Sequence, residues 1–475
     1  MQNLIHDTIC APATAQGGAI ALIRVSGRDS IALVDKIFQG RASLQSSSGY
    51  SLQFGRIREK DGALLDEVLV SVFRAPHSYT GENAVEITCH GSDYIVSRIL
   101  ALLLQNGAKM AAPGEFTQRA FLHGKMDLSQ AEAVADLIAA QTSAAHRVAL
   151  NQLKGGFSEE LAGMRTELLH LASLMELELD FSDEEVEFAD RSQLRELVEK
   201  VLTHCERLIE TFRLGNAIKN GIPVAIVGNT NAGKSTLLNA LLGENRAIVT
   251  DIPGTTRDTI EDTCNLDGVL FRFIDTAGLR ESDDPVERIG IDRAYEKLTA
   301  AQLVLAMLDL TAQLPDLTAS AQTIAARVTP EQQLIFLLNK ADAVPVETTT
   351  EARRSLTPLL SAPGRQLYII SAKSSIGLED LRHALANSWR NLDTTTETTL
   401  VTNTRHLEAL QNAATSLRRV QKGLGNPATS PDSPIPTDLL AQDLRESLYH
   451  LGTITGEIST DEILGNIFRN FCIGK

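Results

Sequence analysis

Short apolar runs recur through the middle of the chain, and each ends at a turn rich in glycine, hydroxyl or amide side chains. The runs cover residues 224–227, 269–274, 334–338 and 367–370. Runs of this length that are apolar at nearly every position are typical of buried parallel strands. Residues 237–242 follow the first run with a helix-forming pattern that Gly243 would end. The alternation of strand and helix predicts an α/β domain built on a parallel sheet.

The N-terminal region has a different pattern. Apolar runs at 18–27 and 68–73 lie between glycine and proline turns, and residues 94–105 have the pattern of one helix. Several strands grouped around few helices predict an α+β domain, which we expect to cover residues 1–122.

Helical patterns flank the α/β domain on both sides. Before it, apolar residues recur every three or four positions, as in the core of a helical bundle; they are Leu161, Met164, Leu168, Leu171 and Met175. Ser129 and Glu132 have the spacing of a helix-capping box. The acidic stretch 176–190 has the character of a solvated face, and the proline-rich stretch 423–437 that of a flexible insert.

The two helical regions predict one discontinuous bundle into which the α/β domain is inserted, because close chain ends make such an insertion tolerable. The fold class is therefore multidomain α/β. Its expected parts are residues 1–122, an α+β domain; 123–219, the first part of the helical domain; 220–378, the inserted domain; and 379–475, the second helical part.

Composition narrows the class of protein. The 475 residues are 43% hydrophobic and 22% charged, with no apolar run long enough to span a bilayer. The first residues lack the pattern of a signal peptide, and five scattered cysteines without a C-x-x-C pair argue against a disulfide framework or a structural zinc site. We therefore expect a cytoplasmic protein without membrane association. The formal net charge of −16 argues against a protein that coats nucleic acid.

Residues 228–236, with the sequence G-N-T-N-A-G-K-S-T, follow the first central strand and match G-x-x-x-x-G-K-[ST]. In such a loop, backbone N–H groups cradle phosphates while the lysine and the hydroxyl serve the phosphates and Mg²⁺. The predicted nucleotide contacts are Asn231, Ala232, Gly233, Lys234, Ser235 and Thr236, and Lys234 is also a catalytic candidate. A glycine-rich turn without a ligand is the alternative for this motif alone.

Three further motifs follow strands in the order that a GTPase needs. They are Asp275, Thr276, Ala277 and Gly278; Asn339, Lys340, Ala341 and Asp342; and Ser371, Ala372 and Lys373. Asp275 would hold Mg²⁺ through water, and the Gly278 N–H would reach the γ-phosphate. Asp342 would accept the N1–H and 2-amino protons of guanine, a pairing that adenine does not offer. Residues 371–373 would donate backbone N–H groups to the guanine O6, so the set predicts GTP as the nucleotide.

The segment after the phosphate loop indicates how GTP would be hydrolysed. Leu279 stands where Ras-type proteins have a water-positioning glutamine, so another group must position the water. Hydroxyls and carbonyls expected near the γ-phosphate come from Thr250, Asp251, Ile252, Pro253, Gly254, Thr255 and Thr256. Thr256 is the candidate Mg²⁺ hydroxyl. Asn231 offers an amide oxygen to an additional monovalent cation, which would neutralise charge developing between the β- and γ-phosphates; a plain surface asparagine is the alternative.

These motifs, together with V-E-R-I-G at 286–290 and F-C-I-G-K at 471–475, resemble the MnmE (TrmE) family of potassium-dependent GTPases that modify the wobble uridine of certain tRNAs. The resemblance covers nearly the whole chain. It implies that K⁺ is held by Asn231, Thr250, the Ile252 carbonyl and Thr255, and Mg²⁺ by Ser235 and Thr256. It also implies that Glu287 orients the hydrolytic water through a bridging water once two G domains meet. Without the resemblance, Glu287 would be one more surface carboxylate.

The resemblance implies a tetrahydrofolate-binding fold for residues 1–122, which would also form a homodimer. Arg24, Glu82 and Lys125 match the residues that contact a 5-formyl- or methylene-tetrahydrofolate, although by themselves they are ordinary surface charges. A carboxylate can read the donor–acceptor edge of a pterin, and Arg or Lys can pair with the glutamyl tail.

The C-terminal residues carry a cysteine between apolar neighbours. If this tail reaches the folate site, Cys472 would act as a thiolate or redox group, Lys475 as a folate contact, and Gly474 would allow close approach of the backbone to the ligand. A frayed tail is the alternative.

The expected function is GTP hydrolysis that drives addition of an aminomethyl or carboxymethylaminomethyl group at C5 of the wobble uridine of tRNA. The resemblance implies a flavoprotein partner, MnmG, that supplies much of the tRNA surface. Two alternatives remain: a regulatory GTPase of ribosome assembly, and a folate-dependent carrier in which the G domain has a structural role. The C-I-G-K end and the lack of a basic RNA-binding domain favour tRNA modification.

Overall fold

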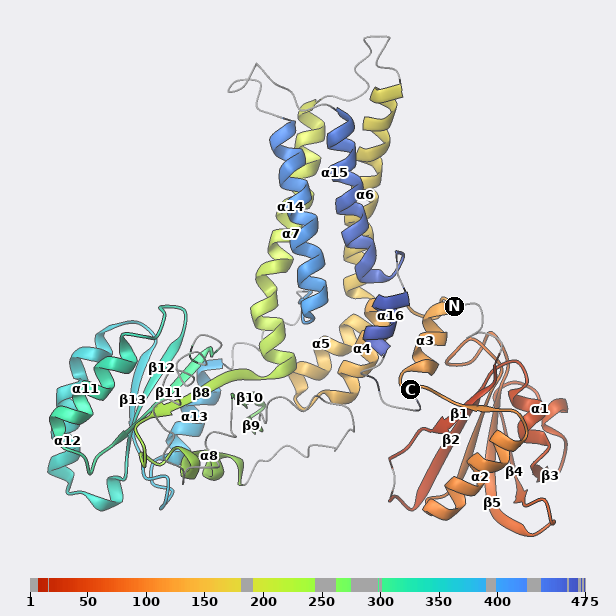
Figure 1. The fold of residues 1–475 in the computed structure, drawn as a ribbon, viewed down its shortest axis with the longest axis horizontal. Helices are drawn as coiled ribbons and strands as arrows, with labels where there is room; N and C mark the ends of the chain where they lie inside the picture. The colour runs from red at the N-terminus through yellow and green to blue at the C-terminus, as the bar shows by residue number, and fades with distance from the viewer. Residues whose placement is uncertain are drawn as a thin grey trace. The chain divides into compact units, whose positions relative to one another are not determined.

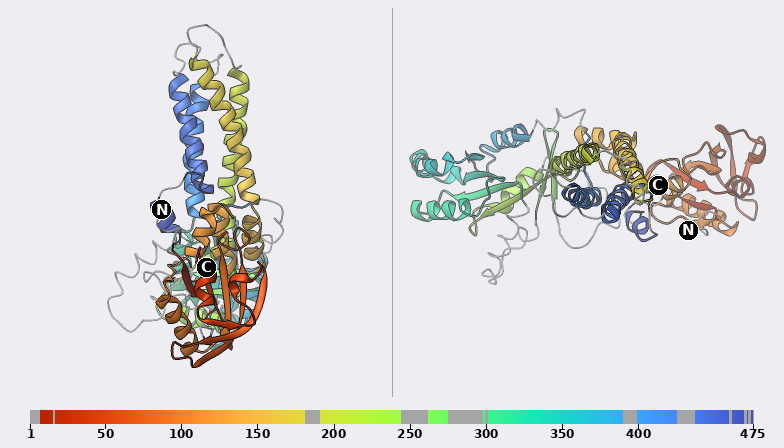
Figure 2. Two further views of the ribbon diagram at one scale, coloured as in Figure 1. Left: turned by 90° about the vertical axis from the view of Figure 1, so that its right-hand side faces the viewer. Right: turned by 90° about the horizontal axis from the view of Figure 1, so that it is seen from above.

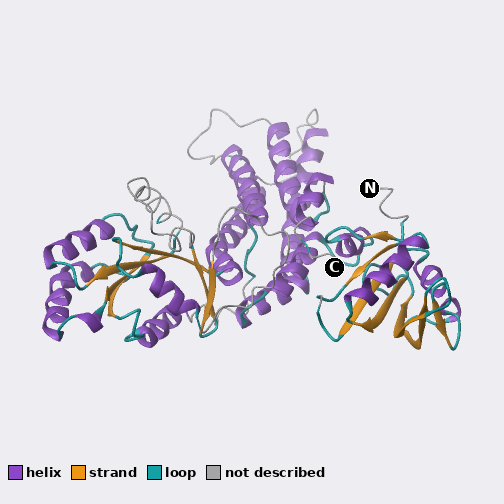
Figure 3. Cartoon of the chain, turned by 60° about the horizontal axis from the view of Figure 1, so that its bottom comes forward, coloured by secondary structure: helices purple, strands orange, loops and turns teal. Residues whose placement is uncertain are grey.

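The computed structural model describes residues 7–15, 17–180, 191–243, 262–274, 298, 301–389, 399–424, 437–458, 461–468, 471 and 474. It divides into two compact units. The first contains Met1–Ile138, Asn151–Cys205 and Ala409–Lys475, and the second contains Ala139–Leu150 and Glu206–Glu408. Each unit contains one β-sheet among its described residues, as Figure 3 shows in orange.

The N-terminal sheet has seven strands in the order β3-β4-β5-β6-β2-β1-β7. Neighbours are antiparallel except for β1 and β7. The strands are β1 Ile9–Pro12, β2 Ile20–Ser26, β3 Phe38–Gly40, β4 Ser51–Arg58, β5 Leu64–Phe73, β6 Ala84–His90 and β7 Lys109–Met110. This arrangement confirms the predicted strands and the α+β character of the region.

Two helices, α1 (Ser30–Asp35) and α2 (Asp93–Gln105), cover one face of this sheet. Ile31 and Ile99 of these helices join Ile23, Val70 and Ile87 of the strands in one buried cluster. The opposite side of β4 and β5 is exposed and apolar, because Leu52, Phe54 and Leu69 are at least 41% exposed. Phe54 and Leu69 lie directly opposite each other on the two strands.

Three helices follow the sheet: α3 (Glu115–Leu122), α4 (Leu128–Ala139) and α5 (Ser143–Leu153). The predicted capping box of Ser129 and Glu132 is wrong, because both residues are buried inside α4. The reciprocal cap is formed two residues earlier. The Asp127 N–H donates to Oε1 of Gln130 at 2.9 Å, and the Gln130 N–H donates to Oδ1 of Asp127 at 2.8 Å. Asp and Gln satisfy the free N–H groups of the first turn as well as Ser and Glu do.

Four long helices from two separate stretches of the chain lie side by side (Figures 1 and 2): α6 (Gly156–Asp180), α7 (Arg191–Asn220), α14 (Thr404–Gly423) and α15 (Thr437–Thr455). The predicted core stripe of α6 is confirmed, because its five members, Leu161, Met164, Leu168, Leu171 and Met175, are all buried. Side-chain contacts between helices include His204 with Glu160 at 2.6 Å and Arg419 with Asp443 at 2.7 Å. The short helix α16 (Asp461–Phe468) contacts α3. Residues 181–190 and 425–436, which contain most of the predicted acidic face and insert, lie outside the described residues.

The second sheet has six strands in the order β13-β12-β11-β8-β10-β9. Five are parallel, and β9 pairs antiparallel with β10 at one edge. The strands are β8 Ile222–Gly228, β9 Asp262–Leu266, β10 Val269–Phe273, β11 Leu303–Asp309, β12 Gln333–Asn339 and β13 Arg365–Ile369. The predicted parallel sheet is therefore confirmed, with β11 added between two strands that the sequence indicated.

Helices cover both faces of this sheet. One buried cluster contains Leu237 of α8 (Lys234–Leu242) and Leu381 of α13 (Leu378–Trp389). The cluster on the other face contains Leu317 of α11 (Leu314–Ala325) and Leu356 of α12 (Val346–Leu356). In an open sheet with this construction, ligands bind beyond the carboxyl ends of the parallel strands. No helix in the described ranges is both long enough and apolar enough to cross a membrane.

Candidate nucleotide and folate sites

The loop between β8 and α8 brings its backbone close to the ends of neighbouring strands. Gly233 has φ of +98°, and a Cβ at this position would lie 2.2 Å from Nδ2 of Asn339. Only glycine fits such a position without displacing its neighbour. The helix α8 begins at the next residue, so its free N–H groups point into the same loop. Backbone donors at a helix start form a site for phosphate.

Asn339 holds two loops of this site together. It is 2% exposed; its Nδ2 donates to the Ala232 carbonyl at 2.7 Å, and its Oδ1 accepts from the Ala372 N–H at 2.9 Å. The phosphate loop, the N-K-A-D motif and the S-A-K motif therefore meet at one buried amide. Three predicted motifs that lie far apart in the sequence are brought together.

Lys340 follows Asn339 in a left-handed backbone conformation, with φ of +66°. Its Nζ lies 2.6 Å from Oδ2 of Asp309, which ends β11 in register with Asn339. Oδ1 of Asp309 accepts from the N–H and Oγ1 of Thr311 at 2.9 and 2.6 Å. Burial alone would raise the pKa of Asp309, but the hydrogen bonds from Lys340 and Thr311 lower it overall.

The other residues predicted to read guanine lie beside this contact. Asp342 is exposed and lies in a single turn of 3-10 helix, Ala341–Ala343. Ser371 is buried, and its Oγ contacts the N–H and Oγ of Ser374 at 3.2 and 2.7 Å. Lys373 is exposed. This geometry leaves the Asp342 carboxylate accessible to the N–H donors of a base.

The side chains of the phosphate loop suit a nucleotide with its cations. Nζ of Lys234 donates to the carbonyls of Gly228 and Asn229 at 2.9 and 3.0 Å, so the lysine lies over its own loop. Ser235 lies in the first turn of α8 and Thr236 follows it, exposed. Asn231 is exposed with φ of +60°. A hydroxyl at Ser235 and an amide oxygen at Asn231 are the hard oxygen donors that Mg²⁺ and K⁺ require.

Many predicted residues lie outside the described residues, so their roles stay predictions. They are Thr250, Asp251, Ile252, Pro253, Gly254, Thr255, Thr256, Asp275, Thr276, Ala277, Gly278, Glu287, Cys472 and Lys475.

In the N-terminal domain, Arg24 of β2 lies between aromatic rings. Its guanidinium is 5.1 Å from the ring centre of Tyr79 and 5.7 Å from that of Phe116. Its Nε donates to Oε1 of Glu86 at 2.9 Å. The Tyr79 hydroxyl contacts Oγ1 of Thr117 at 2.8 Å. Burial raises the pKa of Tyr79 despite the opposing effects of Thr117 and Arg24.

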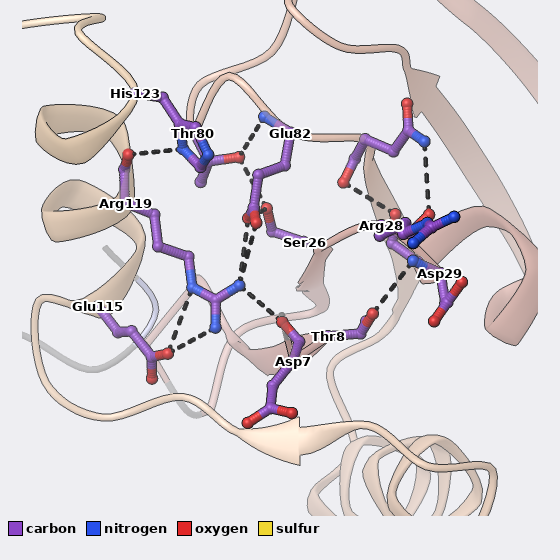
Figure 4. Close-up of polar contacts among 12 residues, drawn as sticks. Asp7, Thr8, Ser26, Arg28, Asp29, Thr80, Glu82, Glu115, Arg119 and His123 are labelled. Atoms are coloured by element: carbon purple, nitrogen blue, oxygen red, sulfur yellow. Dashed lines mark hydrogen bonds and ion pairs between the residues drawn. The ribbon is translucent and has the colours of Figure 1, made fainter. Parts of the chain in front are cut away.

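Glu82 lies in a buried polar network rather than on the surface (Figure 4). Its Oε2 accepts from Oγ of Ser26 at 2.8 Å, and Ser26 also contacts Oγ1 of Thr80. Nη1 of Arg119 lies 3.2 and 3.3 Å from the two carboxylate oxygens. Ser26 and Arg24 are two residues apart on β2, so Glu82 and Arg24 lie on the same face of this strand.

Lys125 is exposed, and its Nζ donates to the Pro76 carbonyl at 3.2 Å. It lies near Glu82 because a Cβ on Gly81 would be 3.4 Å from Cγ of Lys125. Ser26 thus connects Glu82 with the strand that carries Arg24, and Gly81 lies against Lys125, which follows α3.

The described residues of the C-terminal tail contact the N-terminal domain. A Cβ on Gly474 would lie 2.0 Å from the Pro12 carbonyl, so this glycine allows close approach to the end of β1. A Cβ on Gly114 would lie 2.9 Å from both the Phe468 carbonyl and Cβ of Phe471. For Phe471 and Gly474, these contacts favour a docked tail over a frayed one.

Sequence reasoning missed several residues that shape both sites. Asp309 carried a usable signal, because it follows the apolar run of β11 just as Asp275 follows its own run. Glu115 and Arg119 have the spacing of a helical ion pair, which is usually exposed. Nothing in the sequence marked the rings of Tyr79 and Phe116 as neighbours of Arg24.

The second unit is thus a P-loop nucleotide-binding domain with a guanine-type base motif, joined to a helical bundle and an α+β domain. The family model described as "MnmE helical domain" matches residues 128–472, and that described as "GTP-binding protein TrmE N-terminus" matches residues 8–125. The tRNA modification GTPase MnmE of Parabacteroides distasonis is 52% identical over 99% of this chain and 100% of its own. The corresponding protein of Bacteroides thetaiotaomicron is 51% identical over the same shares. The chain belongs to the MnmE family of tRNA modification GTPases.

Among solved structures, the G domain of the T. maritima FeoB iron transporter is 24% identical, covering 35% of this chain and 97% of its own, with a TM-score of 0.24.

Proposed function

We propose that this GTPase acts with a flavoprotein partner, MnmG, to add an aminomethyl or carboxymethylaminomethyl group at C5 of the wobble uridine of tRNA. The observation that carries the proposal is the setting of Glu82 in a tRNA modification GTPase: it bonds Ser26, two residues from Arg24 on β2, and the preceding Gly81 lies against Lys125. These charges suit a folate, which combines a pterin edge with an anionic glutamyl tail.

In the proposed folate site, different residues would contact different parts of the ligand. The Glu82 carboxylate would accept hydrogen bonds from the pterin, and Arg24 and Lys125 would pair with carboxylates of the glutamyl tail. Lys475 is a further proposed contact. Methylene-tetrahydrofolate would supply the one-carbon unit when bound. Cys472 is proposed as a thiolate or redox group beside this site, and a Cys472→Ser protein that still modified tRNA would exclude it as a nucleophile.

The proposed GTP site uses the phosphate loop with residues that follow it. Lys234 would contact the phosphates; Ser235 and Thr256 are the proposed Mg²⁺ ligands. The proposed K⁺ ligands are Asn231, Thr250, the Ile252 carbonyl and Thr255. Their K⁺ would neutralise charge developing in the transition state, the role that an arginine finger has elsewhere. Asp342 would select guanine.

Glu287 is proposed to position the hydrolytic water, and its replacement by alanine tests this role. Glu287→Ala should bind GTP with unchanged affinity and lose most turnover, because water positioning contributes only to the hydrolytic step. Fluorescent nucleotide titration and single-turnover phosphate release measure the two properties. Wild-type turnover would show that another group positions the water.

We propose a cytoplasmic homodimer formed through the N-terminal domain. The apolar face of β4 and β5, with Leu52, Phe54 and Leu69 exposed, supports an interface there, because contiguous apolar surface marks association sites. The net charge of −16 supports a division of labour in which MnmG supplies much of the tRNA contact.

Nucleoside mass spectrometry of tRNA tests the function as a whole. Cells that lack the protein should lose the C5 group from wobble uridine, and the wild-type gene should restore it. Unchanged uridine in a strain without a redundant enzyme would contradict the proposal and favour a role in ribosome assembly. If product formed at the same rate whatever the nucleotide state, the folate-carrier alternative would be favoured.

A further inference from the structure

Arg119 of α3 is a buried guanidinium between two buried carboxylates (Figure 4). It is 1% exposed, while Glu82 and Glu115 are 8% and 6% exposed. Nη2 of Arg119 lies 2.8 Å from Oε1 of Glu115, and Nη1 lies 3.2 Å from Oε1 of Glu82. Burying charged groups costs folding free energy unless they are paired and hydrogen-bonded. A buried cluster of three charges therefore suggests a role beyond stability.

The hydrogen bonds of Arg119 are directed at the protein itself. Nη1 also donates to the Asp7 carbonyl at 2.7 Å, and Nε donates to Oε1 of Glu115 at 3.3 Å. The other oxygen of Glu115 accepts from the Ala112 N–H at 2.9 Å, which fixes that carboxylate to the chain before α3. Arg119 is thus held in place from several directions by acceptors of the protein.

Glu82 keeps acceptor capacity that its partners do not use. Within the described residues, Oε1 of Glu82 has Arg119 as its partner, while Oε2 accepts from both Ser26 and Arg119. A carboxylate oxygen can accept two hydrogen bonds. Two carboxylates against one guanidinium also give the cluster a formal charge of −1. A ligand edge with N–H donors would satisfy the remaining lone pair.

We propose that Arg119 is a positioning residue, which fixes the Glu82 carboxylate so that its remaining lone pair meets the N–H donors of a pterin. The inference rests on the proposed folate binding and adds the residue that determines selection of the pterin edge. The same helix places its neighbours at the other contacts: the Phe116 ring lies beside Arg24, and Thr117 bonds the Tyr79 hydroxyl. Helix α3 therefore positions two of the three proposed folate contacts.

The test compares two ligands on the purified full-length protein. Isothermal titration gives the dissociation constants of 5-formyl-tetrahydrofolate and of its 2-desamino analogue, which lacks the donor that Glu82 would read. The wild type should discriminate between them. In Arg119→Met the natural ligand should bind roughly tenfold to hundredfold more weakly, as expected for loss of a charged hydrogen-bond arrangement, and the discrimination should disappear.

Arg98→Met is the matched control, because Arg98 forms an ion pair with Glu59 in the same domain at 2.6 Å and its side chain is 42% exposed. The control should retain both affinities. A double-mutant cycle with Glu82→Gln completes the design. If Arg119 acts through Glu82, the two substitutions together should cost little more than either alone.

The outcomes separate the inference from the function on which it rests. A wild-type protein that binds no folate removes the proposed folate site itself. A wild type that binds, with an Arg119→Met variant that retains full discrimination, overturns the inference alone. The inference is also overturned if both affinities fall equally and the cycle is additive, because that pattern describes general loosening of the domain.

A conservative variant covers the case in which Arg119→Met does not fold. Arg119→Lys keeps the charge but cannot span both carboxylates with a planar fork. It should fold and still lose discrimination by about threefold or more, since a lysine cannot hold Glu82 and Glu115 together. Unchanged discrimination in Arg119→Lys overturns the positioning role.

Discussion

Replacing Asp309 with asparagine tests how the guanine motif keeps its lysine in place. Asp309 contacts Nζ of Lys340 through Oδ2 and accepts two hydrogen bonds from Thr311 through Oδ1. Asparagine has nearly the same shape, and its oxygen can still accept from Thr311. The substitution therefore removes the negative charge beside Lys340 and places an amide N–H donor where Oδ2 accepted from Nζ, so the contact with Lys340 is lost while the bonds from Thr311 can remain.

The size of the effect follows from the exposure of the pair. The Asp309 and Lys340 side chains are 19% and 34% exposed, so solvent screens part of their attraction. A charge-assisted contact in such a place contributes about 1 kcal/mol. Because Lys340 lies between Asn339 and Asp342, the proposed base-reading residue, we expect the binding free energy of a guanine nucleotide to fall by this amount. The nucleotide should then dissociate about fivefold faster.

The pH dependence provides a check on the cause. The pKa of Asp309 is lowered in the folded protein, so its contribution is fully present above its unfolded value, about 3.9, and is lost only as the pH falls through the lower folded value. At neutral pH the carboxylate is ionised throughout. The ratio of variant to wild-type rates should therefore be constant between about pH 6 and pH 8.

Stopped-flow release of a fluorescent GDP, chased with excess GDP, measures the dissociation rate. Asp316→Asn is the control, because Asp316 is an exposed acid in the first turn of α11 in the same domain and loses the same charge. An Asp309→Asn rate equal to that of Asp316→Asn would refute the role assigned to the Lys340 contact. A ratio that changed across this pH range would point to a different titrating group.

Three other substitutions follow from close contacts and exposure. Gly233→Ala should weaken GTP binding at least tenfold in a nucleotide titration, because left-handed strain alone costs about 1–3 kcal/mol and the new Cβ meets Asn339; wild-type affinity would contradict this. Phe54→Glu should shift the protein towards monomer in analytical ultracentrifugation, whereas Val346→Glu, exposed in the other unit, should not. Gly114→Ala should displace Phe471 and speed limited proteolysis of the C-terminal segment; unchanged cleavage would mean that the tail tolerates a side chain there.

Most of the fold could be predicted because its signals are local. The runs that became β8 and β12 are apolar along nearly their whole length, as strands buried on both faces must be, whereas β10 and β13 include polar and partly exposed positions. The capping box was placed two residues too late because several polar residues near the start of α4 have compatible spacing, and tertiary packing decides which of them is buried.

More residues of the nucleotide site than of the folate site could be identified from the sequence alone, and the reason is physical. A phosphate loop is formed by consecutive residues, so its chemistry is visible in one stretch of sequence. The folate candidates depend on partners far along the chain: Glu82 and Arg119 are 37 residues apart, and Arg24 and Glu86 are 62 residues apart. The spacing of Glu115 and Arg119 alone predicts an exposed ion pair. Only the fold shows that the pair is buried and that Glu82 is a second partner of Arg119.

Helix α3 connects two features that the sequence presents separately. Its side chains position Glu82 and the aromatic rings beside Arg24, while Gly114 at its N-terminus lies against Phe468 and Phe471 of the C-terminal segment. A ligand that contacts Glu82 would therefore be connected, through Arg119 and α3, to the surface on which the tail docks. Linkage between binding events is reciprocal, so if the proposed folate favours docking of the tail, docking favours folate binding by the same factor. On this argument, Gly114→Ala should weaken binding of the proposed folate although Gly114 is not itself a proposed contact, because it disturbs α3 and displaces the tail that carries Lys475.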